Sequence, residues 1–231
     1  MAFEYKGPIC AYCKKLSCEY PQEGKAFPNY CPSQNEKELL DQVEQIYKRD
    51  DKVRSLAAAS ARTEASGYMR RTRIEDVMDF ASRIGATKLG IAHCVGLIRE
   101  ARITMDILKA NGFIVHAVCC KVGSVEKEKL GLADEEKISP GEYESMCNPI
   151  AQAALLDNAG CQLNLVVGLC VGHDSLFFQH SKAPVTVLVA KDRVLGHNPA
   201  AALYNADSYY NRLKKGQNAD DYILERMGRK E

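Results

Sequence analysis

From residue 86 onward the chain alternates short apolar runs with helix-like patterns, and this alternation constrains its fold more than any other feature. The apolar runs, each of strand length, are residues 88–94, 113–120, 163–169 and 184–190. The segments between them have helical apolar spacing, and Asn148-Pro149 is a typical helix start. Strands that alternate with helices predict an α/β domain with a mostly parallel, open, Rossmann-like sheet and helices on both faces. We expect at least four strands, in the order second, first, third, fourth.

Two zones of different composition precede this predicted domain. Residues 1–33 are rich in Pro and Cys and have no sustained apolar periodicity, so this stretch cannot form a core of its own. Residues 34–84 have helical apolar spacing, and their last run opens with the capping-box pair Thr72 and Glu75. We therefore expect an N-terminal metal knuckle (1–33), a helical segment that packs on the core (34–84), and the α/β domain (85–231). The tail to Glu231 also has a helical, amphipathic pattern.

Composition and charge limit the classes of function. The chain has 31 Lys and Arg against 30 Asp and Glu, a formal net charge of +1, which disfavours general nucleic-acid binding. No stretch approaches the roughly 20 apolar residues of a membrane span, and the N-terminus lacks the apolar core of a signal peptide. Ten cysteines in such a chain favour thiolate–metal chemistry over disulfides. We expect a cytoplasmic protein that has no membrane partner, and nucleic acid is a disfavoured partner.

The N-terminal cysteines follow the spacing Cys-x2-Cys-x4-Cys-x12-Cys. Four thiolates in a short segment without a core fit a tetrahedral site whose metal stabilises the fold. Zn is the metal we expect, and an iron–sulfur cluster is the alternative because such clusters use similar spacings. Unrelated free thiols, or disulfides in a secreted protein, would be the purely structural explanation. The predicted ligands are Cys10, Cys13, Cys18 and Cys31.

Five of the six downstream cysteines map to one edge of the predicted sheet. Three apolar runs end at Cys94, at Cys119-Cys120 and at Cys170, and Cys147 directly precedes a predicted helix. Ligands bind in open α/β folds at the carboxyl ends of the strands, so these thiols should line a site there. An iron–sulfur cluster or Zn with an open coordination position is the cofactor we expect. The predicted ligands are Cys94, Cys120, Cys147 and Cys170, with Cys119 as a substitute for its neighbour.

The same cysteines could instead be small buried side chains, since free Cys is among the most buried residue types. Cys161 starts the third strand, at the opposite edge, and we expect it to be such a structural thiol. His93 and His116 lie within predicted strands and are interpreted as core histidines.

Several polar residues near the predicted edge are candidates for substrate chemistry. His173 could be a further ligand or the proton donor and Asp174 its partner, although Asp174 could equally cap the next helix. Lys191, Arg193 and His197 follow the fourth strand and could hold an anionic substrate, with solvated surface charge as the alternative.

Two charged segments have alternative interpretations as well. The segment 121–146 is long for a connection and could be a mobile lid or a surface insertion. The arginines between residues 62 and 73 could bind phosphate or RNA, but an ion-paired helix face explains them more simply.

Several segments together resemble a known group of proteins. They are the N-terminal cysteine segment, Cys147-Asn148-Pro149-Ile150-Ala151-Gln152, Gly168-Leu169-Cys170-Val171-Gly172-His173-Asp174, Ala183-Pro184-Val185-Thr186, Lys191-Asp192-Arg193 and Gly196-His197-Asn198-Pro199. This set resembles an uncharacterised bacterial and archaeal family of metal-binding proteins that contain a domain of unknown function. The resemblance covers most of the chain and implies a metal-binding role for the cysteines, but no reaction.

These observations predict a metal-binding protein with a structural four-cysteine site and a second cysteine-rich site for redox or sulfur-related chemistry. The substrate would be a small molecule, possibly anionic, and whether the protein is an enzyme stays open. A metal or cluster carrier that hands its cargo to a partner is the alternative, and an RNA-binding module is a weaker one. The sequence does not determine the oligomeric state.

Overall fold

The computed structural model describes residues 5–19 and 26–214 of the chain. The chain divides into two compact units, Met1–Tyr68 and Met69–Glu231. The division falls inside the predicted helical segment 34–84, so the last predicted helix belongs to the same unit as the sheet. Most of the predicted C-terminal helix lies outside the described residues. Within those residues, no helix has the length and apolarity to cross a membrane.

The first unit is built of helices that follow the cysteine-rich segment. Its elements are the 3-10 turn η1 (Cys10–Tyr12) and the helices α1 (Pro32–Asn35), α2 (Lys37–Arg49) and α3 (Asp51–Gly67). The Asp50 side chain begins α3 by accepting hydrogen bonds from the N–H groups of Lys52 and Val53, at 2.9 and 3.0 Å. These bonds satisfy two of the donors that a helix start leaves free.

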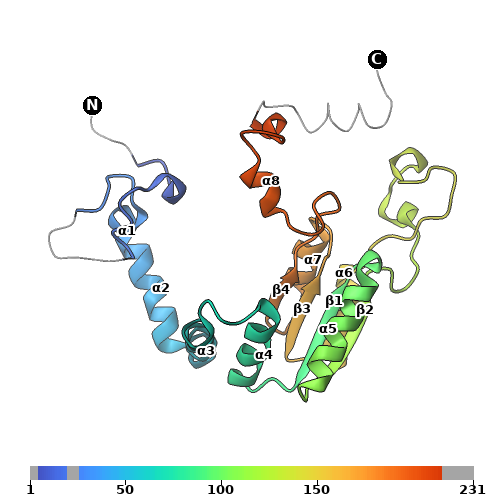
Figure 1. The fold of residues 1–231 in the computed structure, drawn as a ribbon, viewed down its shortest axis with the longest axis horizontal. Helices are drawn as coiled ribbons and strands as arrows, with labels where there is room; N and C mark the ends of the chain where they lie inside the picture. The colour runs from blue at the N-terminus through green and yellow to red at the C-terminus, as the bar shows by residue number, and fades with distance from the viewer. Residues whose placement is uncertain (1–4, 20–25, 215–231) are drawn as a thin grey trace. The chain divides into compact units, whose positions relative to one another are not determined.

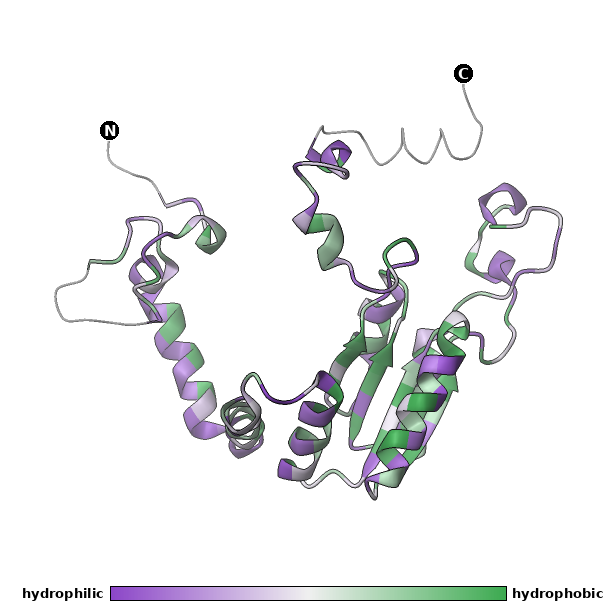
Figure 2. Ribbon diagram, in the orientation of Figure 1, coloured by the Kyte–Doolittle hydropathy of each residue, from purple (hydrophilic) through white to green (hydrophobic). Residues whose placement is uncertain are grey.

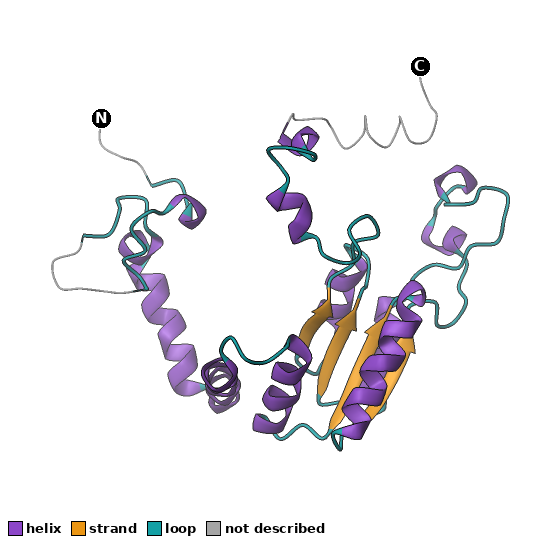
Figure 3. Cartoon of the chain, viewed as in Figure 1, coloured by secondary structure: helices purple, strands orange, loops and turns teal. Residues whose placement is uncertain are grey.

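The second unit contains the predicted parallel sheet (Figure 1, Figure 3). Four strands pair in the order β2-β1-β3-β4, and every pairing is parallel. The strands are β1 (Lys88–His93), β2 (Ile114–Cys119), β3 (Leu163–Val167) and β4 (Val185–Val189). The helices are α4 (Arg73–Arg83), α5 (Ile98–Ala110), α6 (Pro149–Asn158), α7 (His173–His180) and α8 (Ala200–Tyr204). The short 3-10 turns are η2 (Val95–Leu97), η3 (Lys127–Leu130), η4 (Asp134–Glu136) and η5 (Asn211–Lys214). The predicted α/β class and strand order are both confirmed.

Strand position decides how apolar each strand is. β3 is central and buried along its whole length, and its ribbon is mostly in the hydrophobic colour in Figure 2. β2 lies at the edge of the sheet, and its His116 is exposed. The interpretation of His116 as a core histidine was therefore wrong, whereas His93 in β1 is buried and its Nδ1 lies 3.0 Å from the Cys94 carbonyl oxygen.

The order of the strands places the topological switch point between β1 and β3. The chain runs outward from β1 to β2 and then returns to β3, on the other side of β1. Right-handed crossovers then put α5 and α6 on opposite faces, and α5 lies in front of the sheet in Figure 1. In open α/β sheets the crevice outside the carboxyl ends at such a point is the usual binding site.

Candidate functional site

Backbone hydrogen bonds join three cysteine-bearing segments at the carboxyl edge of the sheet. Cys94 follows β1, and its N–H donates to the Val167 carbonyl oxygen at the end of β3, at 3.2 Å. Cys120 follows β2 and donates to the His93 carbonyl oxygen at 2.8 Å. The N–H of Asn148, which caps α6, donates in turn to the Cys120 carbonyl oxygen at 2.7 Å. Cys147, directly before that cap, is thus held beside Cys120.

The thiols of these segments contact one another. The Cys120 thiol lies within hydrogen-bonding reach of the sulfurs of both Cys94 and Cys147, and its own sulfur accepts the Val95 N–H at 3.3 Å. Cys94 and Cys120 are buried, and Cys147 is half-buried. We call these three residues the thiol trio. Their sulfurs come from after β1, after β2 and before α6, segments that are distant in the sequence.

The surroundings of the trio favour thiolate at two of its members. The hydrogen bond from Cys120, followed by the Lys191 ammonium 2.9 Å from the sulfur, lowers the pKa of Cys94 to about 4 against the opposing effect of burial. The same Cys120 thiol, helped by the charges of Lys121 and His173, lowers the pKa of Cys147 to about 5. The pKa of Cys120 is raised by the neighbouring sulfurs of Cys147 and Cys94 and by burial. The trio therefore resembles two thiolates that share one thiol proton.

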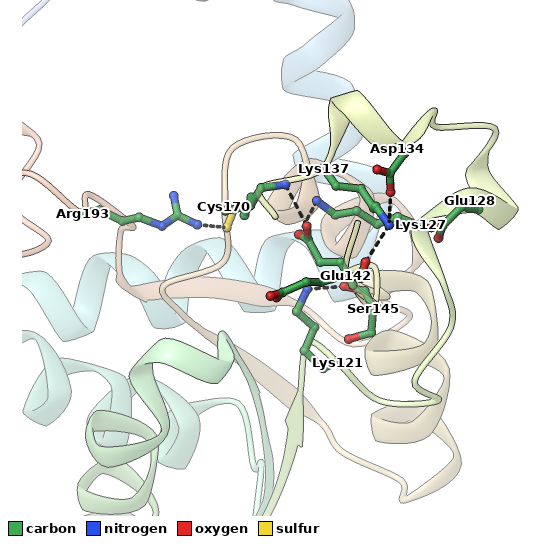
Figure 4. Close-up of polar contacts among 11 residues, drawn as sticks. Lys121, Lys127, Glu128, Asp134, Lys137, Glu142, Ser145, Cys170 and Arg193 are labelled. Carbon is green, nitrogen blue, oxygen red and sulfur yellow. Dashed lines mark hydrogen bonds and ion pairs between the residues drawn. The ribbon is translucent and has the colours of Figure 1, made fainter. Parts of the chain in front are cut away.

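Cys170 lies on the turn between β3 and α7 and has a different partner. Its sulfur accepts a hydrogen bond from Arg193 Nη2 at 3.0 Å, as Figure 4 shows. Gly168 in this turn has a φ of 68°, and a Cβ there would lie 2.5 Å from the Leu97 side chain, so only glycine fits. In the described structure the three thiols of the trio thus interact with one another, whereas Cys170 pairs with the guanidinium of Arg193. Cys119 is half-buried and packs against the core, so Cys120 is the neighbour whose thiol joins the trio.

The other predicted edge residues fall into two groups. Lys191 and Arg193 each contact a cysteine sulfur, and His173 acts by its charge on Cys147 and has a buried Nδ1 without a hydrogen-bond partner in the described structure. His197 and Asp174 are engaged with backbone instead. His197 Nδ1 accepts the Asp192 N–H at 3.1 Å, and Asp174 Oδ1 accepts the N–H of the next residue at 2.8 Å in the first turn of α7.

Two residues at this edge were missed by the sequence analysis. Lys121 directly follows Cys120, and its charge acts on Cys147, a role that adjacency to the cysteines could have suggested. Gln152 is fully buried in α6, and its Nε2 donates to the carbonyl oxygens of His93 and Val118, at 3.2 and 2.7 Å. These bonds connect α6 to the ends of β1 and β2, a role that the sequence did not predict although Gln152 lies in the family-resemblance segment 147–152.

The segment 121–146 is folded on itself through ion pairs (Figure 4). Its Lys137 side chain is buried and contacts Asp134 and Glu128, at 2.5 and 2.9 Å. A second pair joins Lys127 and Glu144 at 2.5 Å. The segment starts and ends beside Cys120 and Cys147, so both its anchors lie at the trio. That the segment 121–146 moves as a lid over the site stays a prediction.

In the N-terminal segment, three cysteines lie around Tyr30. Backbone N–H groups of Leu16 and Lys15, with the Tyr30 hydroxyl, lower the pKa of Cys13. Burial raises the pKa of Tyr30, and the charges of Cys13, Cys31 and Cys10 raise it further. N–H groups directed at a sulfur stabilise a thiolate, the form that binds metal. Cys10 and Cys18 are exposed and Cys31 is buried.

Two further observations bear on the cysteine predictions. Cys161 is buried just before β3, and burial raises its pKa, which confirms it as a structural thiol. Among the described residues, no group of three or more His, Cys, Asp or Glu side chains is arranged to hold a metal ion as it stands. The metal sites stay predictions.

Two arginines of the predicted basic cluster contact partners within the second unit. Arg73 donates to the Val187 carbonyl oxygen at 2.6 Å and so covers part of the outer edge of β4. Arg71 forms an ion pair with Asp79 at 3.1 Å. These contacts favour the interpretation of the cluster as an ion-paired helix face.

Comparison with known proteins gives a family but no activity. The family model described as "Protein of unknown function (DUF1847)" matches residues 31–188, which include the trio and Cys170. An uncharacterised protein of Methanocaldococcus jannaschii, MJ0455, is 41% identical over 206 residues, which cover 89% of this chain and 96% of that protein. No solved structure matches the chain.

Proposed function

The chain belongs to the DUF1847 family of proteins of unknown function, and we propose that it is a metal-binding protein whose thiol trio forms a reactive metal site. The site would carry out redox or sulfur-related chemistry on a small anionic substrate. The N-terminal cysteines Cys10, Cys13, Cys18 and Cys31 would hold a structural Zn. The observation that carries the proposal is the contact of three thiols from separate segments at the carboxyl edge of a parallel sheet.

The donor set fits a soft metal. Thiolates select Zn, Cu(I) or iron–sulfur clusters, and Cys94 and Cys147 have pKa values of about 4 and 5. Metal–sulfur bonds would replace the hydrogen bonds of Cys120, whose proton would leave when the metal binds. Three protein ligands leave a fourth position open, as in catalytic Zn sites, for substrate or for His173. A bound Zn would supply Lewis acidity there, and an iron–sulfur cluster would supply electrons.

The charged side chains around the trio would bind and orient the substrate. Lys191 and Arg193 approach the edge from the turn after β4 and could hold an anionic group. The buried Nδ1 of His173 has no partner in the described structure and could hold a proton for the substrate.

A metal carrier is the second candidate function. The thiol trio and the N-terminal cysteines differ in how exposed their thiols are, and a metal passes to a partner more easily from exposed thiols. Cys94 and Cys120 are buried, which hinders transfer of a metal to a partner protein. Cys10 and Cys18 are exposed, so the N-terminal segment is where a metal-transfer partner would bind.

Anaerobic purification followed by metal analysis, acid-labile sulfide analysis and a visible spectrum tests the proposal. Iron with sulfide, and a brown colour lost in Cys147→Ala, would indicate a cluster on the trio. Zn that falls by one site in Cys147→Ala would indicate a mononuclear centre. Cys161→Ala is the matched control, since Cys161 lies at the opposite edge and should leave the metal content unchanged. Metal content independent of Cys147 would refute the edge site.

A further inference from the structure

We propose that the anionic substrate of this site carries a sulfane sulfur, as thiosulfate and persulfides do, and that Cys170 accepts that sulfur. The inference rests on the proposed function for the location of the site and adds the class of substrate and the acceptor. The observation behind it is a cluster of two cations and two cysteine sulfurs at the switch point of the sheet.

The cluster consists of two cation–sulfur pairs. Lys191 Nζ lies 2.9 Å from Cys94 Sγ, and Arg193 Nη2 lies 3.0 Å from Cys170 Sγ. Both cations come from the turn after β4, and both cysteines follow the neighbouring strands β1 and β3. A Cβ added at Gly96 would lie 3.6 Å from Lys191 Nζ and 3.9 Å from Cys94 Sγ, in space that no side chain of residue 96 fills. Because residue 96 is a glycine, no side chain at that position covers the Lys191–Cys94 pair.

Cys170 is more exposed than two members of the trio, and it alone lies on a glycine-flanked turn. It is half-buried, whereas Cys94 and Cys120 are buried. It lies between Gly168 and Gly172, which have positive φ values of 68° and 84°, in a Gly-x-Cys-x-Gly turn from a strand into a helix. Turns of this kind present a nucleophile at the carboxyl edge of a sheet. Cys170 is therefore accessible to a substrate, whereas the buried sulfurs of Cys94 and Cys120 are not directly accessible.

The partner of Cys170 favours sulfur transfer over acyl transfer. Acyl transfer needs a general base at the nucleophile and donors for a developing oxyanion. In the described structure the hydrogen-bond partner of Cys170 Sγ is the guanidinium of Arg193, which can donate to the sulfur and to an anionic substrate but takes no proton. Attack of a thiolate on a sulfane sulfur needs neither base nor oxyanion donors, because the leaving group departs as a stable anion.

The step is balanced without an external oxidant or reductant. The Cys170 thiolate attacks the outer sulfur of thiosulfate and forms a new sulfur–sulfur bond. The bond between the two sulfurs of thiosulfate breaks, and its electron pair leaves with sulfite. The products are a Cys170 persulfide anion and sulfite, with unchanged total charge. With a persulfide donor, the leaving group is the corresponding thiolate.

The test uses the full-length protein, purified and reduced without oxygen and with its metal retained. One arm receives thiosulfate and the other a small-molecule persulfide, and each is assayed for the released sulfite or thiol. Peptide mapping by mass spectrometry then locates the added sulfur atom. We expect one sulfur on the Cys170 peptide, matched by an equal amount of leaving group, in at least one arm; the arm that reacts identifies the donor.

Three single variants test the roles of Cys170 and Arg193 in sulfur loading. Cys170→Ser should abolish sulfur loading, and Arg193→Gln should slow it by about tenfold or more through loss of a charge-assisted contact. Arg102→Gln, on α5, is the matched control and should load at the wild-type rate. Loading on Cys94, Cys120 or Cys147 in place of Cys170, an unaffected Arg193→Gln, or no loading in either arm would overturn the inference.

Metal analysis of the wild-type protein and of Cys147→Ala separates this inference from the proposed function. Metal that depends on Cys147, without sulfur loading, would overturn the sulfur inference alone. Sulfur loading on Cys170 in a protein whose metal does not depend on Cys147 would support the inference and overturn the metal role of the trio.

Discussion

The two cysteine sets of this protein use the same side chain but are positioned by different means. Cys10, Cys13 and Cys18 lie in a turn-rich segment near the N-terminus, with backbone N–H groups directed at Cys13. The thiol trio is held by hydrogen bonds between the ends of a parallel sheet, as in the bond from Cys120 N to the His93 carbonyl oxygen. The first set depends on local structure, and the second depends on the whole sheet.

This difference indicates what each metal would contribute. A segment without a core gains its fold from the metal, so the N-terminal site should be structural. The segments that carry the trio are positioned by backbone hydrogen bonds at the sheet edge, so a metal there would not be needed to hold them and could keep a coordination position open.

Metal removal should affect the two regions differently. A chelator strong enough to strip thiolate-bound metal should make the segment up to Cys31 far more sensitive to protease, by tenfold or more in cleavage rate. The far-ultraviolet circular dichroism of the sheet unit should change little. Loss of the sheet signal together with the N-terminal segment would show that the trio also depends on metal for its assembly.

The substitution Gly90→Ala should weaken the sheet unit selectively. A Cβ at Gly90 would lie 2.1 Å from Asn164 Oδ1, inside the contact of β1 with β3. We expect the free energy of unfolding to fall by about 2–4 kcal/mol, measured by urea denaturation. Gly131→Ala is the control: nothing lies within 4 Å, and its positive φ should cost only about 1 kcal/mol. Equal losses in the two variants would contradict the packing argument.

The variant Lys191→Met should raise the pKa of Cys94. The hydrogen bond of Cys120 and the Lys191 ammonium hold that pKa at about 4, below the ordinary 9.0. The thiolate therefore contributes stability that is complete above pH 9 and is lost as the pH falls toward 4. Without the ammonium, the pKa should rise by about one unit or more in a titration of thiolate absorbance on metal-free protein.

Lys182→Met serves as the control for this titration, because Lys182 is exposed and pairs with Asp157. It should leave the thiolate titration at its wild-type midpoint. A midpoint that also stays in place in Lys191→Met would mean that the ammonium does not act on Cys94.

A small effect is expected in the first unit from Asp50→Ala. The side chain caps α3 through the N–H groups of Lys52 and Val53. Loss of this cap should reduce helix stability by about 1 kcal/mol, seen as faster amide hydrogen exchange in the first turns of α3. Exchange in β1 and β3 should be unchanged. Faster exchange in the strands would show that the two regions are energetically coupled.

The sequence predicted the fold more fully than the site. The alternation of strands and helices predicts the parallel sheet and the edge where Cys94, Cys120, Cys147 and Cys170 belong, because strand ends follow from chain direction alone. The choice of Cys120 over Cys119 depends on which way each side chain points from the strand. The pairing of Cys170 with Arg193 depends on contacts between segments 23 residues apart. Such distinctions come from three-dimensional packing, which periodicity does not record.

The most direct measurement is a metal count by native mass spectrometry of the reduced, anaerobically purified protein and two single variants. The account predicts two separately occupied sites in the wild-type protein. Cys13→Ala should lose the N-terminal metal and retain the other, while Cys120→Ala should lose the edge metal and retain the N-terminal one. A wild-type protein whose full metal content survives in Cys120→Ala would contradict the claim that the thiol trio is a metal site.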